Sequence, residues 1–215
     1  MSIEKDIDYK EHWNKVYSNC EMKQLGWYEE IPEPSLSLID KCDLNKSAII
    51  LDVGSGTTTL IKKLLEDGYS NIIATDLSDV ALSKAIEALE PEKEKLINWV
   101  VDDITNPNHL NKIGTVDLWH DRTVLHFLTQ ENQQQGYLST LKKLVKVGGY
   151  VIIAVFSLKG AKKCSGLDVV NYDHIKLSQF LGNEFELLEY LPYLYIQPSG
   201  GERPYIYTLF NRKIL

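Results

Sequence analysis

Residues that can do chemistry follow three short apolar segments of this 215-residue chain. A glycine turn, Gly54 to Gly56, follows the first segment, Asp76 ends the second, and Asp102-Asp103 end the third. Glycines let a ligand approach the backbone closely, and a carboxylate at Asp76 can accept two hydrogen bonds from a ribose diol. A carboxylate at Asp102 or Asp103 can accept a bond from an adenine amino group while the N–H of Ile104 faces the ring. The pattern therefore indicates a nucleotide-type site.

Each of these features also has a purely structural interpretation. Many strand-to-helix turns need glycine for the backbone alone, Asp76 can cap the helix that follows it, and Asp103 can be a solvated loop residue. Ser78 is available for the capping role, however. Acidic strand ends in register favour a ligand site, because ligands bind at the carboxyl edge of an open α/β sheet.

Short apolar segments alternate with amphipathic ones from residue 47 onward, which is typical of a mostly parallel sheet with helices on both faces. Segments rich in β-branched residues predict buried strands at Ala48–Val53, Asn71–Asp76, Ile97–Val101, Val116–His120 and Tyr150–Phe156. Amphipathic segments between them predict crossover helices at Thr58–Asp67, Asp79–Leu89 and Gln130–Lys146. Gly68 and Gly148-Gly149 suit left-handed helix ends, and Ser78 suits an N-cap.

The two ends of the chain depart from this rhythm. Residues 184–190 and 205–210 each alternate between polar and apolar side chains, with a Pro/Ser/Gly-rich connection between them. They predict an antiparallel closing hairpin. Residues 1–46 predict one or two helices packed as a lid, with Pro32 and Pro34 breaking the chain. We expect one domain over 1–215, with this lid on a sheet core that spans 47–215.

Composition excludes several classes of function. The chain has 23 basic and 30 acidic residues and a net charge of −7, so no basic field is available to attract nucleic acid. Its three cysteines lack the spacing of a disulfide framework or a zinc site, and we expect no metal. The charged amino terminus does not resemble a signal peptide, and no apolar run is long enough for a membrane span. A cytoplasmic protein without a membrane or nucleic-acid partner is expected.

The motifs together resemble the class I S-adenosylmethionine-dependent methyltransferases. The resemblance covers about residues 47–213 and rests on LDVGSGTTTL, ATDLS, VVDDIT and VDLWHDR, the strand after VGG, and the closing hairpin. It implies a Rossmann-like, seven-stranded, mostly parallel sheet with an antiparallel C-terminal hairpin, and S-adenosylmethionine as cofactor. Carried over by position, the cofactor-binding residues are Asp52, Gly54, Ser55, Gly56, Asp76, Leu77, Asp103, Ile104 and His120. In the family, the glycines pass beneath the methionine part, and the backbone at the position of His120 contacts the methionine ammonium.

One position departs from the family pattern, because the usual third glycine is Thr58 here. A nicotinamide-dependent dehydrogenase is the main rival for a glycine turn plus a ribose acid, but its GxGxxG fingerprint needs a glycine where this chain has Thr59. The acid directly before the glycines and the closing hairpin also favour the methyltransferase.

The segment from Trp119 to Phe127 resembles the W-D-R segment of thiopurine methyltransferase and the D-R or D-K-G segments of methyltransferase-like protein lysine methyltransferases. In the former, the arginine that matches Arg122 lies beside the acceptor. We assign possible catalytic roles to Asp121, Arg122 and His120, since a base is needed only for a protonated acceptor. Asp121 can instead form an ion pair with Arg122 that shapes the loop. The expected substrate-pocket residues are Trp27, Tyr28, Arg122, His126 and Cys164, although His126 and Cys164 each have a structural alternative.

We therefore expect a methyltransferase whose site is roofed by residues 20–32 and 157–172. Methyl transfer from a sulfonium is an in-line displacement, so the protein has to position the acceptor and exclude water. A small molecule with an N, S or O acceptor is the first expectation, and a protein lysine is the alternative. A catalytically inactive partner subunit that binds S-adenosylmethionine is a third hypothesis.

Overall fold

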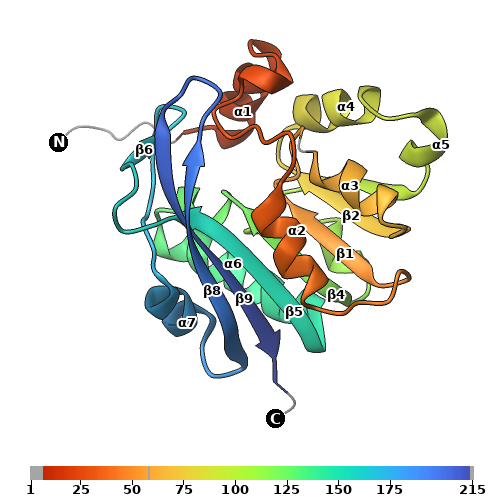
Figure 1. Cartoon of the computed structure of the whole chain (residues 1–215), viewed down its shortest axis with the longest axis vertical. Coiled ribbons are helices and arrows are strands. Elements are labelled where there is room, and N and C mark those ends of the chain that lie inside the picture. The colour runs from red at the N-terminus through yellow and green to blue at the C-terminus, as the bar shows by residue number, and fades with distance from the viewer. Residues whose placement is uncertain (1–6, 58, 214–215) are drawn as a thin grey trace.

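The computed structural model describes residues 7–57 and 59–213, so the Thr58 departure lies outside the described residues. A seven-stranded sheet forms the centre of the molecule, in the order β3-β2-β1-β4-β5-β9-β8 (Figure 1). The strands are β1 (Ile49–Val53), β2 (Asn71–Asp76), β3 (Ile97–Val101), β4 (Val116–Arg122), β5 (Val145–Phe156), β8 (Phe185–Ile196) and β9 (Glu202–Arg212). The first five are mutually parallel, and the hairpin β8–β9 joins β5 antiparallel. The predicted sheet and closing hairpin are confirmed.

Strand register brings the chemically interesting residues to one edge. Val53 at the end of β1 pairs with Thr75 on one side and with Asp121 on the other, while Asp76 pairs with Val101 of β3. The chain order reverses between β1 and β4, because β2 and β3 extend the sheet one way and β5 the other. A crevice opens at such a reversal, outside the carboxyl ends of the strands.

Helices cover both faces of the sheet because the parallel strands carry apolar side chains on both sides. On one face, α2 (Glu33–Asp40) and α3 (Leu60–Glu66) pack on Ile50 and Ile72. On the other, α6 (Glu131–Leu144) and α7 (His174–Leu181) pack on Val151 and Ile153. The helix α4 (Asp79–Glu87) and the short α5 (Pro91–Glu94) connect β2 to β3. Ser78 caps α4 as predicted, since its Oγ accepts a hydrogen bond from the N–H of Ala81 at 3.1 Å.

The amino-terminal segment forms α1 (Tyr9–Ser18), the 3-10 turn η1 (Met22–Gln24) and α2. Asn14 of α1 contacts α4 through a hydrogen bond to Asp79 at 3.0 Å. Pro32 and Pro34 do more than break the chain, because both belong to the start of α2. Pro32 stands at the N-cap of α2 and Pro34 in its first turn, where the missing N–H has no helical acceptor to lose.

Three details differ from the sequence prediction. Gly148 has a φ of +79° but does not end a helix, because α6 stops at Leu144 and β5 begins at Val145. The positive φ accompanies a register shift against β4 instead. Residues 163–168 carry a two-stranded hairpin, β6 (Lys163–Cys164) and β7 (Leu167–Asp168), and α7 follows it.

No helix in the described ranges combines the length and apolarity that a bilayer crossing needs.

Candidate active site

A cleft lies outside the carboxyl ends of the central strands, where α1, the segment after η1 and the β8–β9 hairpin meet. Its volume is about 1140 Å³ with its open mouth included, which is large enough for a nucleotide-sized ligand and an acceptor together. The predicted residues that line it are Gly54, Asp76, Leu77, Asp103, Ile104, Trp27, Arg122 and Cys164. One cavity thus contains the glycine turn, the residues expected at the ribose and at adenine, and part of the expected substrate pocket.

The glycine turn is shaped by backbone conformation and by close neighbours. Gly54 has a φ of +62° and Gly56 a φ of +50°, a region that residues with a Cβ rarely adopt. A Cβ at Gly54 would overlap the side chain of Val124, and one at Gly56 would lie 2.5 Å from the hydroxyl of Tyr17. The glycine turn beneath the cleft therefore requires glycine at both positions.

Asp76 is held as a hydrogen-bond acceptor at the end of β2. Its Oδ2 accepts from the N–H of Gly56 at 2.9 Å, and its Oδ1 accepts from the N–H of Ser78 at 2.8 Å. Burial raises the pKa of the Asp76 carboxyl to about 6, although those backbone bonds act in the opposite direction. Each oxygen keeps a lone pair, so the side chain can receive two hydroxyl groups. Ser78 caps the next helix, which removes helix capping as the explanation of Asp76.

The neighbouring acids Asp102 and Asp103 have different surroundings. Partial burial alone would raise the pKa of Asp102, but backbone N–H groups of Asp103, Asn108, His109 and Leu110 donate to its carboxylate and hold the pKa below its usual value. Asp102 thereby organises the loop. Asp103 is exposed on the cleft wall and uses Oδ1 to accept from Thr105, and Ile104 lies beside it.

Asp121 and Arg122 do not form the ion pair that the sequence suggested. Successive side chains of a strand point to opposite faces of the sheet, so these two β4 residues face apart. Asp121 is fully buried and accepts from the hydroxyl of Tyr137 at 2.6 Å and from the N–H groups of Val124 and Leu125. Burial raises its pKa to about 6. In the described structure Asp121 lines neither the cleft nor the recess beside it.

Arg122 finds its carboxylate partner in Glu29, a residue that the sequence did not single out. Arg122 Nε lies 3.1 Å from Glu29 Oε2 and 3.0 Å from the hydroxyl of Tyr207, while Nη1 donates to the carbonyl of Trp27 at 2.9 Å. Both charged side chains are at least nine-tenths buried. Burial raises the pKa of Glu29, and the Arg122 charge opposes that shift. The pair stands between the cleft and a smaller recess.

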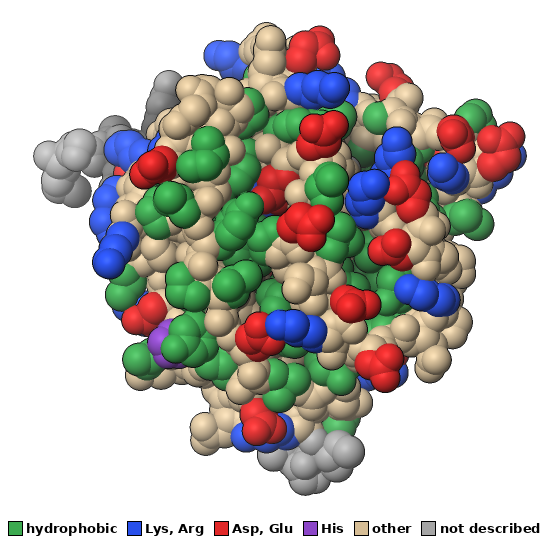
Figure 2. Space-filling view, viewed as in Figure 1, with side chains coloured by type: hydrophobic (Ala, Val, Ile, Leu, Met, Phe, Trp, Pro, Cys, Tyr) green, Lys and Arg blue, Asp and Glu red, His purple; other side chains and the backbone are tan. Residues whose placement is uncertain are grey.

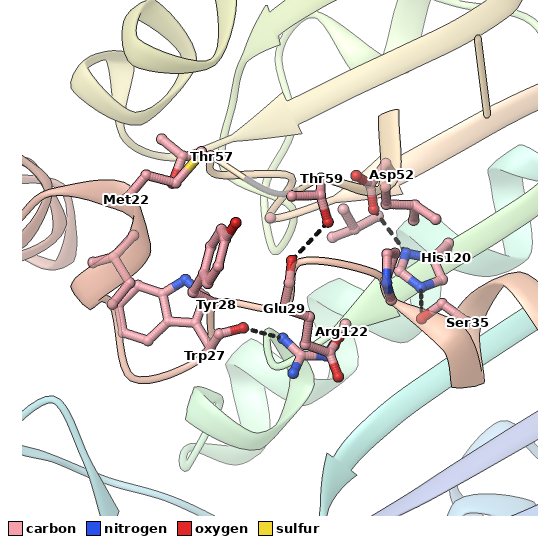
Figure 3. A pocket seen from close by; sticks show the side chains of 15 residues that line it. Met22, Trp27, Tyr28, Glu29, Ser35, Asp52, Thr57, Thr59, His120 and Arg122 are labelled. Atoms are coloured by element: carbon pink, nitrogen blue, oxygen red, sulfur yellow. Dashed lines mark hydrogen bonds and ion pairs between the residues drawn. The ribbon is translucent and has the colours of Figure 1, made fainter. Parts of the chain in front are cut away.

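That recess contains three other predicted residues, Asp52, His120 and Tyr28 (Figure 3). His120 Nδ1 lies 2.7 Å from Asp52 Oδ1, and its Nε2 lies 2.9 Å from Ser35 Oγ of α2. His120 is only 3% exposed, so this chain of bonds fixes both the imidazole and the Asp52 carboxylate. In this geometry the His120 side chain acts as a structural clamp between β1, β4 and α2.

Three of the remaining predicted residues, His126, Ser55 and Gly56, line neither cavity, whereas Cys164 lines the cleft. His126 is fully buried, accepts from the N–H of Phe156 at 3.4 Å, and has a pKa that burial lowers to about 3, so it is neutral at physiological pH. Ser55 is buried in the turn, and Gly56 contributes its N–H to Asp76. Burial raises the pKa of the Cys164 thiol, which favours an uncharged side chain on the cleft wall.

Sequence reasoning missed most of the aromatic wall. Phe127, Phe156 and Tyr205 line the same cleft as Trp27, and Tyr195 and Tyr205 present their rings to the Arg122 guanidinium at 5.2 and 5.3 Å. These side chains come from η3 (Leu125–Phe127), β5 and the hairpin. Their only signal in the sequence is a tyrosine-rich pattern that also fits ordinary sheet packing.

Comparisons with known proteins agree with this geometry. A family model described as a methyltransferase domain matches residues 51–151, the part that contains the glycine turn and all three strand-end acids. A SAM-dependent methyltransferase structure from Anabaena variabilis superposes with a TM-score of 0.78 at 15% identity, over 97% of this chain and 96% of that one. The chain contains a methyltransferase domain and has the fold of the S-adenosylmethionine-dependent methyltransferases.

The methyltransferase is also similar to two curated proteins named EEF1A lysine methyltransferase 2. The one from Danio rerio is 26% identical over 157 residues, which cover 67% of this chain and 66% of that protein. The one from Mus musculus is 25% identical over 196 residues, which cover 85% of this chain and 74% of that protein. Because it covers 85% of this chain, the second match extends beyond residues 51–151.

Proposed function

We propose that this methyltransferase transfers a methyl group to the ε-amine of a protein lysine. The observation that carries the proposal is the similarity to two lysine methyltransferases, since the longer match includes more than the cofactor-binding core. The open cleft supports it as well, because a side chain must enter from a bulky partner. A small-molecule acceptor, which the sequence alone favoured, becomes the second candidate.

The aromatic wall suits this acceptor. An ammonium is attracted to the faces of Trp, Tyr and Phe rings, and Trp27, Phe127 and Tyr205 all face the cleft. A lysine must lose its proton before it can attack a methyl carbon. An apolar surrounding disfavours the charged form and lowers the pKa of an entering amine, so the ammonium can release its proton to solvent water before the attack, without a dedicated base.

The residues on the other side of the cleft fit the cofactor. We propose that Asp76 holds the ribose hydroxyls, that Asp103 and the N–H of Ile104 hold adenine, and that the glycine turn lies beneath the sulfur. Bound S-adenosylmethionine supplies the methyl group as a sulfonium substituent. Asp121 positions the Val124–Leu125 turn of the wall and does not accept a proton, because three donors already occupy its carboxylate.

The surface around the cleft offers a partner both charge and apolar contact. The chain is acidic overall, and hydrophobic side chains gather over the β8–β9 hairpin (Figure 2). Leu194 and Ile196 of β8 are 50% and 53% exposed. A basic protein that presents a lysine would approach an acidic surface favourably.

The test is transfer of an isotopically labelled methyl group from S-adenosylmethionine into a cell extract, followed by separation of protein from small molecules. The proposal expects label in protein, and methylated lysine after acid hydrolysis. Asp76→Ala should abolish the signal, whereas Glu92→Ala, an exposed change on α5, should leave it intact. Label confined to small molecules would replace the lysine with the second candidate. Binding of S-adenosylmethionine without any transfer would indicate an inactive partner subunit.

A further inference from the structure

Helix α6 packs behind the cofactor side of the cleft, and Gln133 in its first turn lines the cleft itself. Three residues further along, the adjacent residues Gly136 and Tyr137 contact two different parts of the structure. Gly136 faces the loop that follows β3, and Tyr137 faces the end of β4. Each of these parts carries one end of the assigned cofactor site.

Gly136 allows α6 to approach the loop after β3 very closely. A Cβ at this position would overlap the carbonyl group of Thr105, and a backbone group cannot turn aside as a flexible side chain can. Thr105 in turn orients the acid assigned to adenine, since its N–H and its hydroxyl both donate to Asp103 Oδ1, at 2.8 and 2.7 Å. The absence of a side chain at Gly136 therefore determines where the loop places Asp103.

Tyr137 belongs to a fully buried chain of hydrogen bonds. Its hydroxyl accepts from the indole N–H of Trp119 at 3.1 Å and donates to Asp121 Oδ2 at 2.6 Å. An indole N–H can only donate and a carboxylate can only accept, so the direction of both bonds is fixed. The Tyr137 hydroxyl thus holds the Asp121 carboxylate in one orientation.

Asp121 transmits this constraint to the glycine turn. Its oxygens accept from the N–H groups of Val124 at 2.8 Å and of Leu125 at 3.0 Å. The preceding residue, Thr123, has a φ of +78°, which β-branched residues rarely adopt, so this turn needs outside support. The Val124 side chain lies so close to Gly54 that a Cβ on the glycine would overlap it. Asp121 therefore holds Val124 against the glycine turn.

We propose that Gly136 and Tyr137 are positioning residues, and that they set the two ends of the cofactor site from one helix. Gly136 acts on the adenine end through Thr105. Tyr137 acts on the glycine turn, beneath the sulfur, through Asp121. Neither of the two helix residues lines the cleft in the described structure, so each acts through its neighbour. The proposal rests on the assigned cofactor residues and does not depend on which acceptor is methylated.

Calorimetry with two ligands separates the two ends. Adenosine contains the adenine and the ribose, whereas S-adenosylhomocysteine also contains the sulfur. Tyr137→Phe keeps the ring and loses the hydroxyl, so S-adenosylhomocysteine should bind about 10-fold more weakly while the affinity for adenosine stays unchanged. Gly136→Ala should weaken both ligands about 10-fold, although alanine has the higher helix propensity.

Each variant has a matched control. Ser139→Ala is an exposed change on the same helix that also raises helix propensity. Tyr69→Phe removes the hydroxyl of a buried tyrosine that packs on the other face of the sheet. Neither control should change the affinity for either ligand. The melting temperature of each variant measures its stability, and binding is measured well below the lowest of these temperatures.

A Tyr137→Phe variant that loses stability but keeps both affinities would overturn the role of Tyr137, as would equal weakening of both ligands. Unchanged adenosine binding in Gly136→Ala would overturn the role of Gly136. If either variant does not fold, Asp121→Asn replaces the first and Thr105→Val the second, with the same results required. Binding of neither ligand to the natural chain would contradict the assigned cofactor itself. Absence of lysine methylation leaves all these affinities unchanged, so the two proposals fail separately.

Discussion

The two halves of the cleft are built in different ways. The nucleoside half uses Asp76 and Asp103 at the ends of β2 and β3, and N–H groups of residues nearby in the chain orient these acids. The acceptor half, which contains residues 26–29 and the aromatic wall, depends on contacts between residues far apart in the chain, such as Tyr195 with Tyr28 and Arg122 with Glu29. The first half follows from local chain geometry, and the second exists only when the hairpin, β4 and the amino-terminal segment are assembled. We therefore expect changes in the first to affect binding, and changes in the second to affect stability as well.

The largest effect is expected from Arg122→Met. This change leaves the buried Glu29 carboxylate without its counter-charge, which costs about 3–5 kcal/mol of unfolding free energy. The double variant Arg122→Met/Glu29→Met should recover part of that loss, because no unpaired buried charge remains. Urea denaturation of the three proteins measures both quantities. A single variant as stable as the natural chain would contradict the buried ion pair.

Asp76→Ala addresses the other half and should leave the fold largely intact. Loss of the carboxylate removes the acceptor of both ribose hydroxyls, so S-adenosylhomocysteine should bind roughly 30- to 1000-fold more weakly. Calorimetry measures this effect, and the melting temperature reports on the fold. Unchanged affinity would remove Asp76 from the site. If Asp76→Ala lost more unfolding free energy than binding free energy, the two halves of the cleft would not differ in the way described.

The pH dependence of nucleoside binding follows from the raised pKa of Asp76, about 6 in the free protein. The ionised carboxylate accepts the ribose hydroxyls, and protonation removes part of that capacity. Affinity for 5′-methylthioadenosine should therefore be constant above about pH 7 and fall roughly tenfold by pH 5. This ligand, which is S-adenosylmethionine without its amino-acid end, reports on the nucleoside half alone. A flat profile would show that Asp76 does not titrate in this range.

The smallest effect is expected at Gly26, where the segment 26–29 begins. Gln197→Ala removes the hydrogen bond to the carbonyl of Gly26, which contributes about 1 kcal/mol. The melting temperature should fall by a few degrees, and binding of 5′-methylthioadenosine should not change. The exposed change Glu202→Ala on the same hairpin provides the control. A large loss of nucleoside affinity in Gln197→Ala would mean that the two halves are not separable.

The same contrast explains what could be predicted from the sequence. The strands and the acids Asp76 and Asp103 were predictable, because hydrophobic patterning fixes the strands and a parallel sheet places their carboxyl ends at one edge. The role of Gly148 was not, because a glycine after a helical pattern looks the same whether it ends a helix or accompanies an irregularity in a strand.

The acceptor side was the least predictable part. Glu29 follows Trp27 and Tyr28 in a segment without periodicity, and its burial depends on Arg122, whose own direction follows from the alternation of β4. That alternation was available from the sequence and argues against the Asp121–Arg122 ion pair. The hairpin tyrosines were visible as an alternating pattern, but which of their faces meets the cleft depends on the register of β9 on β5.

A crystal structure of the chain with S-adenosylhomocysteine tests the division of the cleft most directly. We predict ribose hydroxyls on the Asp76 carboxylate, adenine beside Asp103 and the N–H of Ile104, and the sulfur above Gly54. A ribose that lies away from Asp76, or a sulfur that lies away from the glycine turn, would contradict this division.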